Sequence, residues 1–114
     1  MDIAERTSGS VVILDLHGKI TLGDGGDVAL KSKIAGVLQN GHKFILLNLR
    51  DVTYVDSAGL GEIVQAYASA SKNGGKLKLL GMPKRVRDLL AITKLLPIFE
   101  AFEDEDAAVQ SFGK

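Results

Sequence analysis

Apolar and polar positions along the chain switch between the two-residue repeat of a strand and the 3.6-residue repeat of a helix. Three runs are strand-like: VVILDLHG (residues 11–18), KFILLNLRDV (43–52) and KLKLLG (76–81). The middle run is almost continuously apolar, which is typical of a central strand buried on both faces. In the last run Lys76 and Lys78 alternate with leucines, so we expect both lysines to point outward.

Helical spacing of apolar residues predicts four helices between and after these strands. They cover VALKSKIAGVLQN (28–40), a segment from about Leu60 to Asn73, PKRVRDLLAI (83–92) and DEDAAVQSF (104–112). A weakly alternating stretch at residues 3–7 and a short edge strand around residues 97–100 complete the set. The order is therefore β-β-α-β-α-β-α-β-α, which indicates right-handed crossovers.

This order predicts an α/β fold with a mostly parallel or mixed central sheet of about five strands and about four helices. The 114 residues contain no internal repeat, so we expect one domain over residues 1–114 with its core at about 9–112. Apolar residues make up 46% and charged residues 25% of the chain, which are ordinary globular values.

Three predicted loops, 18–26, 51–57 and 81–84, follow the carboxyl ends of parallel strands. Such loops gather along one edge of the sheet, where α/β proteins usually bind ligands and partners. Asp24 and Ser57 should therefore be neighbours in space. His17, near the end of the first long strand, should lie at the same edge.

Composition excludes several classes of function. Without cysteine there are no disulfides, thiolate metal sites or cysteine nucleophiles, and Lys plus Arg balance Asp plus Glu at 14 each. A balanced charge does not attract nucleic acid or anionic lipid, so we expect neither direct nucleic-acid binding nor membrane insertion. The N-terminus has no signal-peptide pattern and no apolar run is long enough to span a bilayer, which predicts a cytoplasmic protein.

The stretch YVDSAGLGEI (residues 54–63) joins the central strand to the second helix and contains more small residues than a connector needs. Either Asp56 or Ser57 can cap the helix, which is worth about 1 kcal/mol, and Gly59 and Gly61 can let the helix pass close to the sheet. Gly59 and Gly61 each cost about 1 kcal/mol against alanine, and a cap requires neither. Some group should therefore approach the backbone closely around Ser57, and the sequence leaves open which.

Catalytic and ligand-binding motifs match only in part. Of the G-x-S-x-G nucleophile elbow only Gly59 is present around Ser57, with His17 and His42 as the candidate bases. GVLQNGHK lacks the Gly-Lys-Ser/Thr ending of a phosphate loop, and GDGGD lacks calcium-loop spacing. KLKLLGMPKRVR is basic but has no interleaved aromatic residues, so it reads as a solvated face. We expect no catalytic residues, cofactor or metal.

The hexapeptide D-S-x-G-L-G after an apolar strand (Asp56 to Gly61) resembles the signature of the anti-sigma factor antagonists, which are single STAS domains. The later run LLPIFEAF, ending at Phe102, is similar to the same family, and the likeness extends from VVILDLHGKIT to the acidic final helix. The resemblance implies a non-enzymatic regulator whose partner is an anti-sigma factor with serine kinase activity. The family's phosphorylated serine corresponds to Ser57, and a separate serine phosphatase would remove the phosphate.

In its unphosphorylated form such a protein binds the anti-sigma factor and frees a sigma factor, and phosphorylation of Ser57 ends the binding. The predicted partner surface is composite, since two loops leave the same sheet edge; it contains Asp56, Ser57, Ala58, Gly59, Leu60, Gly61, Leu22 and Asp24. Two alternatives stay open. One is a STAS subunit of a lipid-transport or stress-signalling assembly that no kinase governs, and the other is a small hydrolase built on Ser57 and His17.

Overall fold

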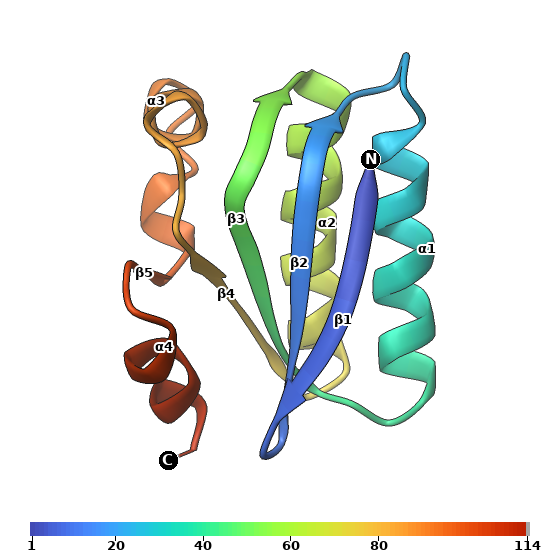
Figure 1. The fold of residues 1–114 in the computed structure, drawn as a ribbon, viewed down its shortest axis with the longest axis vertical. Coiled ribbons are helices and arrows are strands. Elements are labelled where there is room, and N and C mark those ends of the chain that lie inside the picture. The colour runs from blue at the N-terminus through green and yellow to red at the C-terminus, as the bar shows by residue number, and fades with distance from the viewer. Residues whose placement is uncertain (114) are drawn as a thin grey trace.

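A five-stranded sheet with strand order β1-β2-β3-β4-β5 forms the centre of the computed structural model (Figure 1). The structure describes residues 1–113; Lys114, the last residue of the predicted domain, lies outside the described residues. β1 is antiparallel to β2, and the remaining pairs are parallel. The elements are β1 (Asp2–Ser8), β2 (Val11–Ile20), α1 (Gly26–Gln39), β3 (Phe44–Val55), α2 (Ser57–Lys72), β4 (Lys76–Leu80), α3 (Lys84–Ile92), the 3₁₀ turn η1 (Leu96–Ile98), β5 (Ala101–Phe102) and α4 (Glu105–Phe112).

The predicted α/β class, with a mixed sheet of five strands and four helices, is confirmed. Each parallel crossover leads to the next strand in the same direction. Right-handed crossovers therefore place α1 and α2 together behind the sheet, as Figure 1 shows. The larger apolar cluster fills the space between them and the strands, and fully buried Leu14, Leu47 and Ile63 belong to it.

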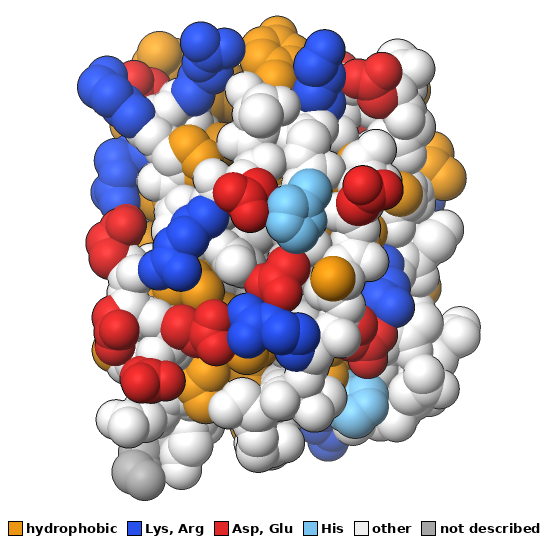
Figure 2. Space-filling model, viewed as in Figure 1, with side chains coloured by type: hydrophobic (Ala, Val, Ile, Leu, Met, Phe, Trp, Pro, Cys, Tyr) orange, Lys and Arg blue, Asp and Glu red, His pale blue; other side chains and the backbone are white. Residues whose placement is uncertain are grey.

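The opposite face of the sheet carries a smaller core. Val11, Ile13, Leu46 and Leu80 pack there against Ala108 and Phe112 of α4. Within the described part of the chain, no helix covers the rest of this face, and Figure 2 shows acidic, basic and histidine side chains along it. Helices thus cover most of one face of the sheet and only a part of the other.

Arg6 of β1 fastens α4 to this open face. Its guanidinium donates to Asp15 at 2.6 and 3.0 Å and to Glu105 at 3.0 and 2.8 Å, so one side chain joins two strands to the last helix. Hydrogen bonds from Arg6 hold the pKa of both Asp15 and Glu105 below their ordinary values. Both carboxylates therefore stay charged in mild acid.

The expected outward placement of Lys78 is wrong, whereas Lys76 is exposed as predicted. Lys78 does point away from the α1–α2 face, but α4 covers this position, so only 3% of the residue is exposed. Its ammonium donates to the carbonyl and hydroxyl oxygens of Ser111 at 3.2 and 2.9 Å. The ammonium lies 4.7 Å from the centre of the Phe112 ring, a cation–π distance.

The edge strand predicted around residues 97–100 is also misplaced. Pro97 lies in the 3₁₀ turn η1, and the strand itself is Ala101–Phe102. Proline has no N–H for a strand ladder, and the first ladder bond runs from the Leu79 N–H to the Glu100 oxygen at 3.0 Å. The pairing of β5 with β4 therefore starts only C-terminal to Pro97.

β2 and β3 are longer than predicted. β2 continues to Ile20, because pairing with β3 resumes after irregularities near Asp15–His17 and Gly18–Lys19. β3 continues to Val55. The loops at the carboxyl edge shrink accordingly to residues 21–25 after β2 and to Asp56 after β3.

Candidate functional site

The carboxyl ends of β2 and β3 meet at one edge, where Ile20 pairs with Val55. The Asp56 N–H donates to the Ile20 carbonyl at 3.3 Å, so the ends of the two strands remain in register. The 21–25 loop and the start of α2 leave from this point. The prediction that the glycine-rich loop and the Ser57 segment are neighbours is confirmed, because Leu22 and Asp56 are hydrogen-bonded.

Asp56, not Ser57, caps α2. One of its carboxylate oxygens accepts from the Gly59 N–H at 2.8 Å, and the other accepts from the Leu22 N–H at 3.0 Å. The hydrogen bond from Gly59, followed by that from Leu22, lowers the pKa of the Asp56 carboxyl. The carboxylate is therefore ionised at neutral pH and holds two segments of backbone at once.

Ser57 is the first residue of α2 and is exposed. Since Asp56 supplies the cap, the Ser57 side chain is not needed to begin the helix. Ala58 beside it is small and only partly buried. The Ser57 hydroxyl is thus presented at the start of a helix, where backbone N–H groups and the helix dipole favour an anion.

The structure explains one of the two glycines that follow. A Cβ on Gly59 would overlap the carbonyl oxygen of Ile20, and it would lie 2.8 Å from the carbonyl carbon of the same residue. Gly59 therefore lets the first turn of α2 rest on the end of β2. A Cβ on Gly61 would meet nothing within 4 Å, and Gly61 lines an open groove between α1 and α2. Packing within the described chain does not require glycine at position 61.

The 21–25 loop is held in shape by its own hydrogen bonds. The Thr21 hydroxyl donates to the Asp24 carboxylate at 3.1 Å and accepts from the Asp24 N–H at 3.2 Å. The Gly26 N–H donates to the Thr21 carbonyl at 3.1 Å, and Gly25 takes a left-handed conformation with φ of 70°. Leu22 is 68% exposed on this loop. An apolar side chain of this size on an ordered loop is a candidate contact for a partner.

The structure separates the eight predicted partner-binding residues into two groups. Leu22, Asp24, Ser57 and Gly61 are exposed, and Asp56 and Ala58 are partly buried at the same edge. Gly59 and Leu60 are buried beneath them. These two residues support the surface through packing.

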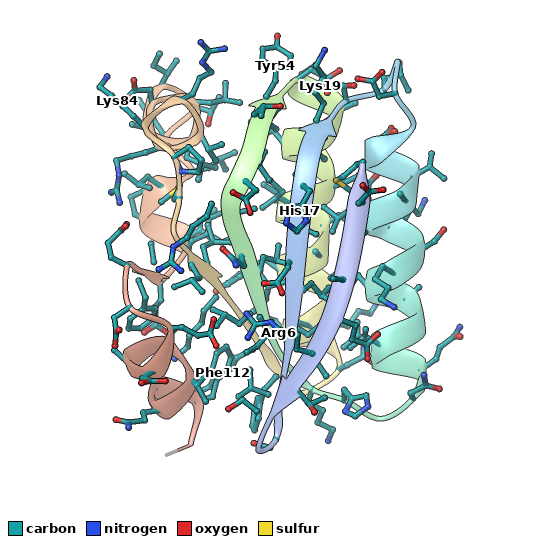
Figure 3. All side chains as sticks on the ribbon, viewed as in Figure 1. Arg6, His17, Lys19, Tyr54, Lys84 and Phe112 are labelled. Atoms are coloured by element: carbon teal, nitrogen blue, oxygen red, sulfur yellow. The ribbon has the colours of Figure 1, made fainter. Side chains whose placement is uncertain are left out.

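His17 does not lie at the Ser57 edge, so that expectation is wrong. β2 runs three residues beyond it, to Ile20. His17 lies in the middle of the open face (Figure 3), and its Nε2 is 3.1 Å from the Asp51 carboxylate. α2 begins behind the sheet, whereas His17 projects from the front. The geometry required of a Ser57–His17 catalytic pair is therefore absent from the described chain.

Tyr54 is a residue at this edge that sequence analysis did not single out. It is 45% exposed and pairs with Lys19 at the upper end of the sheet, where Figure 3 shows both side chains. An aromatic residue one position before the end of a strand, on the face opposite the core, was the available signal. Tyrosine is common at the centres of protein interfaces.

Residues 1–113 show neither a metal site nor a membrane-spanning helix. No group of three or more His, Asp or Glu side chains there is arranged to hold a metal ion. In the same range, none of the helices is long and apolar enough to cross a membrane.

Comparisons with known proteins agree with this geometry. The STAS domain family model matches residues 2–108. The anti-sigma-B factor antagonist of Bacillus subtilis is 33% identical over 81 residues, which span 71% of this chain and 73% of the relative. A crystal structure of a Thermotoga maritima protein assigned to the anti-sigma factor antagonists superposes with a TM-score of 0.89 at 26% identity, covering 98% of this chain and 95% of the other.

The Bacillus anti-sigma factor antagonist SpoIIAA in its unphosphorylated form has the same fold. Its TM-score is 0.79 at 19% identity, with 99% of this chain and 98% of that chain covered. The phosphorylated form of SpoIIAA matches with a TM-score of 0.76. The chain with the Asp56–Ser57 edge described above belongs to the STAS domain family of anti-sigma factor antagonists.

Proposed function

We propose that this protein is a phosphorylation-controlled anti-sigma factor antagonist that works in the cytoplasm. Unphosphorylated, it binds an anti-sigma factor with serine kinase activity and frees a sigma factor. The kinase then transfers a phosphate to Ser57, which ends the binding, and a separate serine phosphatase removes that phosphate. The protein itself is a regulator and a substrate, not an enzyme.

The observation that carries this proposal is that Asp56 caps α2 and leaves the neighbouring Ser57 side chain free of that role. Asp56 caps α2, so the exposed Ser57 hydroxyl is available for modification. The small residue Ala58 beside it leaves room for a kinase to bring a γ-phosphate to the serine oxygen. The relationship to the anti-sigma-B factor antagonist of Bacillus subtilis supports an anti-sigma factor as the partner.

Phosphorylation would act at the surface and leave the fold intact. The start of α2 accommodates an anion, and SpoIIAA keeps this fold in its phosphorylated form. A phosphate adds about −1.5 to −2 charges beside the ionised Asp56. An acidic group of the partner about 4 Å away would meet a repulsion of about 4 kcal/mol per unit charge at a protein surface. Half of that, about 2 kcal/mol, lowers affinity more than tenfold.

The experiment that tests the proposal begins with candidate anti-sigma factors of the source organism. Each is mixed with ATP and this protein, and intact mass is measured. One phosphate should be gained by the natural chain and none by Ser57→Ala, with Thr21, Thr53 and Ser71 as the competing acceptors. A Ser57→Ala protein that still gains one phosphate contradicts the assignment of the site.

Binding of three forms, unmodified, Ser57→Asp and phosphorylated, is then measured against one anti-sigma factor at two ionic strengths. Aspartate brings one charge where phosphate brings up to two, so Ser57→Asp should lose about half as much binding free energy as the phosphoprotein. Added salt should restore part of that loss. Equal binding by all three forms contradicts the switch and favours the assembly subunit that no kinase governs.

A further inference from the structure

The two carboxylate oxygens of Asp56 serve two different parts of the chain. Oδ1 accepts from the Gly59 N–H at 2.8 Å, three residues away, which is an ordinary helix cap. Oδ2 accepts from the Leu22 N–H at 3.0 Å, across a sequence separation of 34 residues. The second bond is not part of the cap, because it joins the start of α2 to a loop that is distant in sequence.

The hydrogen bonds that shape the 21–25 loop internally do not involve Asp56. The bonds between Thr21 and Asp24, from the Gly25 N–H to the Leu22 carbonyl and from the Gly26 N–H to the Thr21 carbonyl join neighbouring residues, and none of them reaches α2. The Asp56 N–H bonds to Ile20, which precedes the loop. The bond to Asp56 Oδ2 is therefore the polar contact that places the Leu22 backbone relative to Ser57.

We infer that Asp56 is a positioning residue that holds Leu22 beside Ser57, so that an anti-sigma factor meets both as one preformed surface. This inference rests on the proposed function. Leu22 is 68% exposed, and an exposed loop residue must be ordered on binding unless something orders it beforehand. If the loop is already fixed before binding, the complex does not lose the conformational entropy of ordering it.

Substitution of Asp56 by asparagine distinguishes its helix-capping bond from its bond to the loop. Asparagine is as good an N-cap as aspartate, but it has only one carbonyl oxygen. In Asp56→Asn, that oxygen can keep the bond from Gly59, while the amide NH₂ faces the Leu22 N–H, donor against donor. The cap survives and the bond to the loop is lost.

Asp104 offers a matched control elsewhere in the chain. It caps α4, and its carboxylate accepts from the Ala107 N–H at 2.9 Å, within its own helix. Asp104→Asn makes the same chemical change at a cap that is not joined to a distant loop. It should alter neither the Leu22 amide nor partner binding.

The first measurement is amide hydrogen exchange followed by NMR, which needs no partner. In Asp56→Asn the Leu22 amide should exchange about tenfold faster, since it loses a bond to a charged acceptor, while the Gly59 amide keeps its protection. An unchanged Leu22 exchange rate overturns the inference. This outcome does not depend on whether the proposed function is right.

The second measurement is affinity for the anti-sigma factor that binds the unmodified protein in the binding experiment above. Asp56→Asn should bind about three- to tenfold more weakly, by the loss of preorganisation. In a Leu22→Ala background the same substitution should cause little further loss, because Asp56 acts through Leu22. Losses that simply add in the double variant overturn the positioning role. Failure of the unmodified protein to bind any anti-sigma factor contradicts the proposed function instead, and the exchange measurement then decides the placement of the loop.

Discussion

Replacing Gly59 and Gly61 separately with alanine gives opposite predictions within one helix. Alanine is favoured over glycine in a helix by about 1 kcal/mol, so sequence-based propensity alone predicts that both variants gain stability. The structure distinguishes them. The Cβ at position 61 points into open space, whereas the Cβ at position 59 overlaps the Ile20 carbonyl oxygen and lies 2.9 Å from the Ile20 Cγ2 atom.

The magnitudes follow from these contacts. Gly61→Ala should raise the free energy of unfolding by about 1 kcal/mol, which is the propensity difference. Overpacking costs about 1–3 kcal/mol, and the upper end applies to Gly59→Ala because the obstacle is backbone held by two paired strands. After subtracting the propensity gain, Gly59→Ala should lower the free energy of unfolding by about 2 kcal/mol.

The assay is urea denaturation of the two variants and the natural chain, with thermal melting as a second measurement. At about 4 °C per kcal/mol for a domain of this size, Gly61→Ala should melt about 4 °C higher and Gly59→Ala about 8 °C lower. The denaturant slope should not change, because the surface exposed on unfolding is the same. Equal stabilisation by both substitutions would refute the close approach of α2 to the end of β2.

Three further predictions concern other parts of the molecule. Charge reversal in Asp24→Lys should weaken binding to the anti-sigma factor, measured by calorimetry, with a nearly unchanged melting temperature; an unchanged affinity removes this residue from the interface. Lys78→Ala should lower the free energy of unfolding by about 2 kcal/mol in urea, since a charged donor and a buried stem are both lost, and limited proteolysis should then cleave within α4. The depressed pKa values of Asp15 and Glu105 contribute stability above their ordinary values of 3.8 and 4.5, and this stability is lost as pH falls through the lower folded values. Arg6→Gln should therefore flatten the acid limb of a stability–pH curve, and a curve parallel to that of the natural chain contradicts this.

The local sequence was sufficient for the order of the elements and for the location of the candidate site. A continuous apolar run indicates a strand buried on both faces, and helical spacing of apolar residues indicates a helix buried on one face. Both patterns can be recognised from the local sequence alone. Chain direction in a parallel sheet then places Asp24 and Ser57 at one edge, whichever side chains surround them. The serine at that edge was recognisable through the D-S-x-G-L-G pattern at Asp56 to Gly61.

Only the tertiary structure decided how each residue of the site is used. The sequence left open what approaches the backbone around Gly59, and the structure shows that it is the end of β2. Lys78 alternates like an exposed residue and is nevertheless buried, because α4 returns from the end of the chain to cover it. The second bond of Asp56 joins residues that are 34 positions apart. Local patterns report which face of an element is apolar, whereas these contacts depend on which distant segment packs there, and that is settled only when the whole chain has folded.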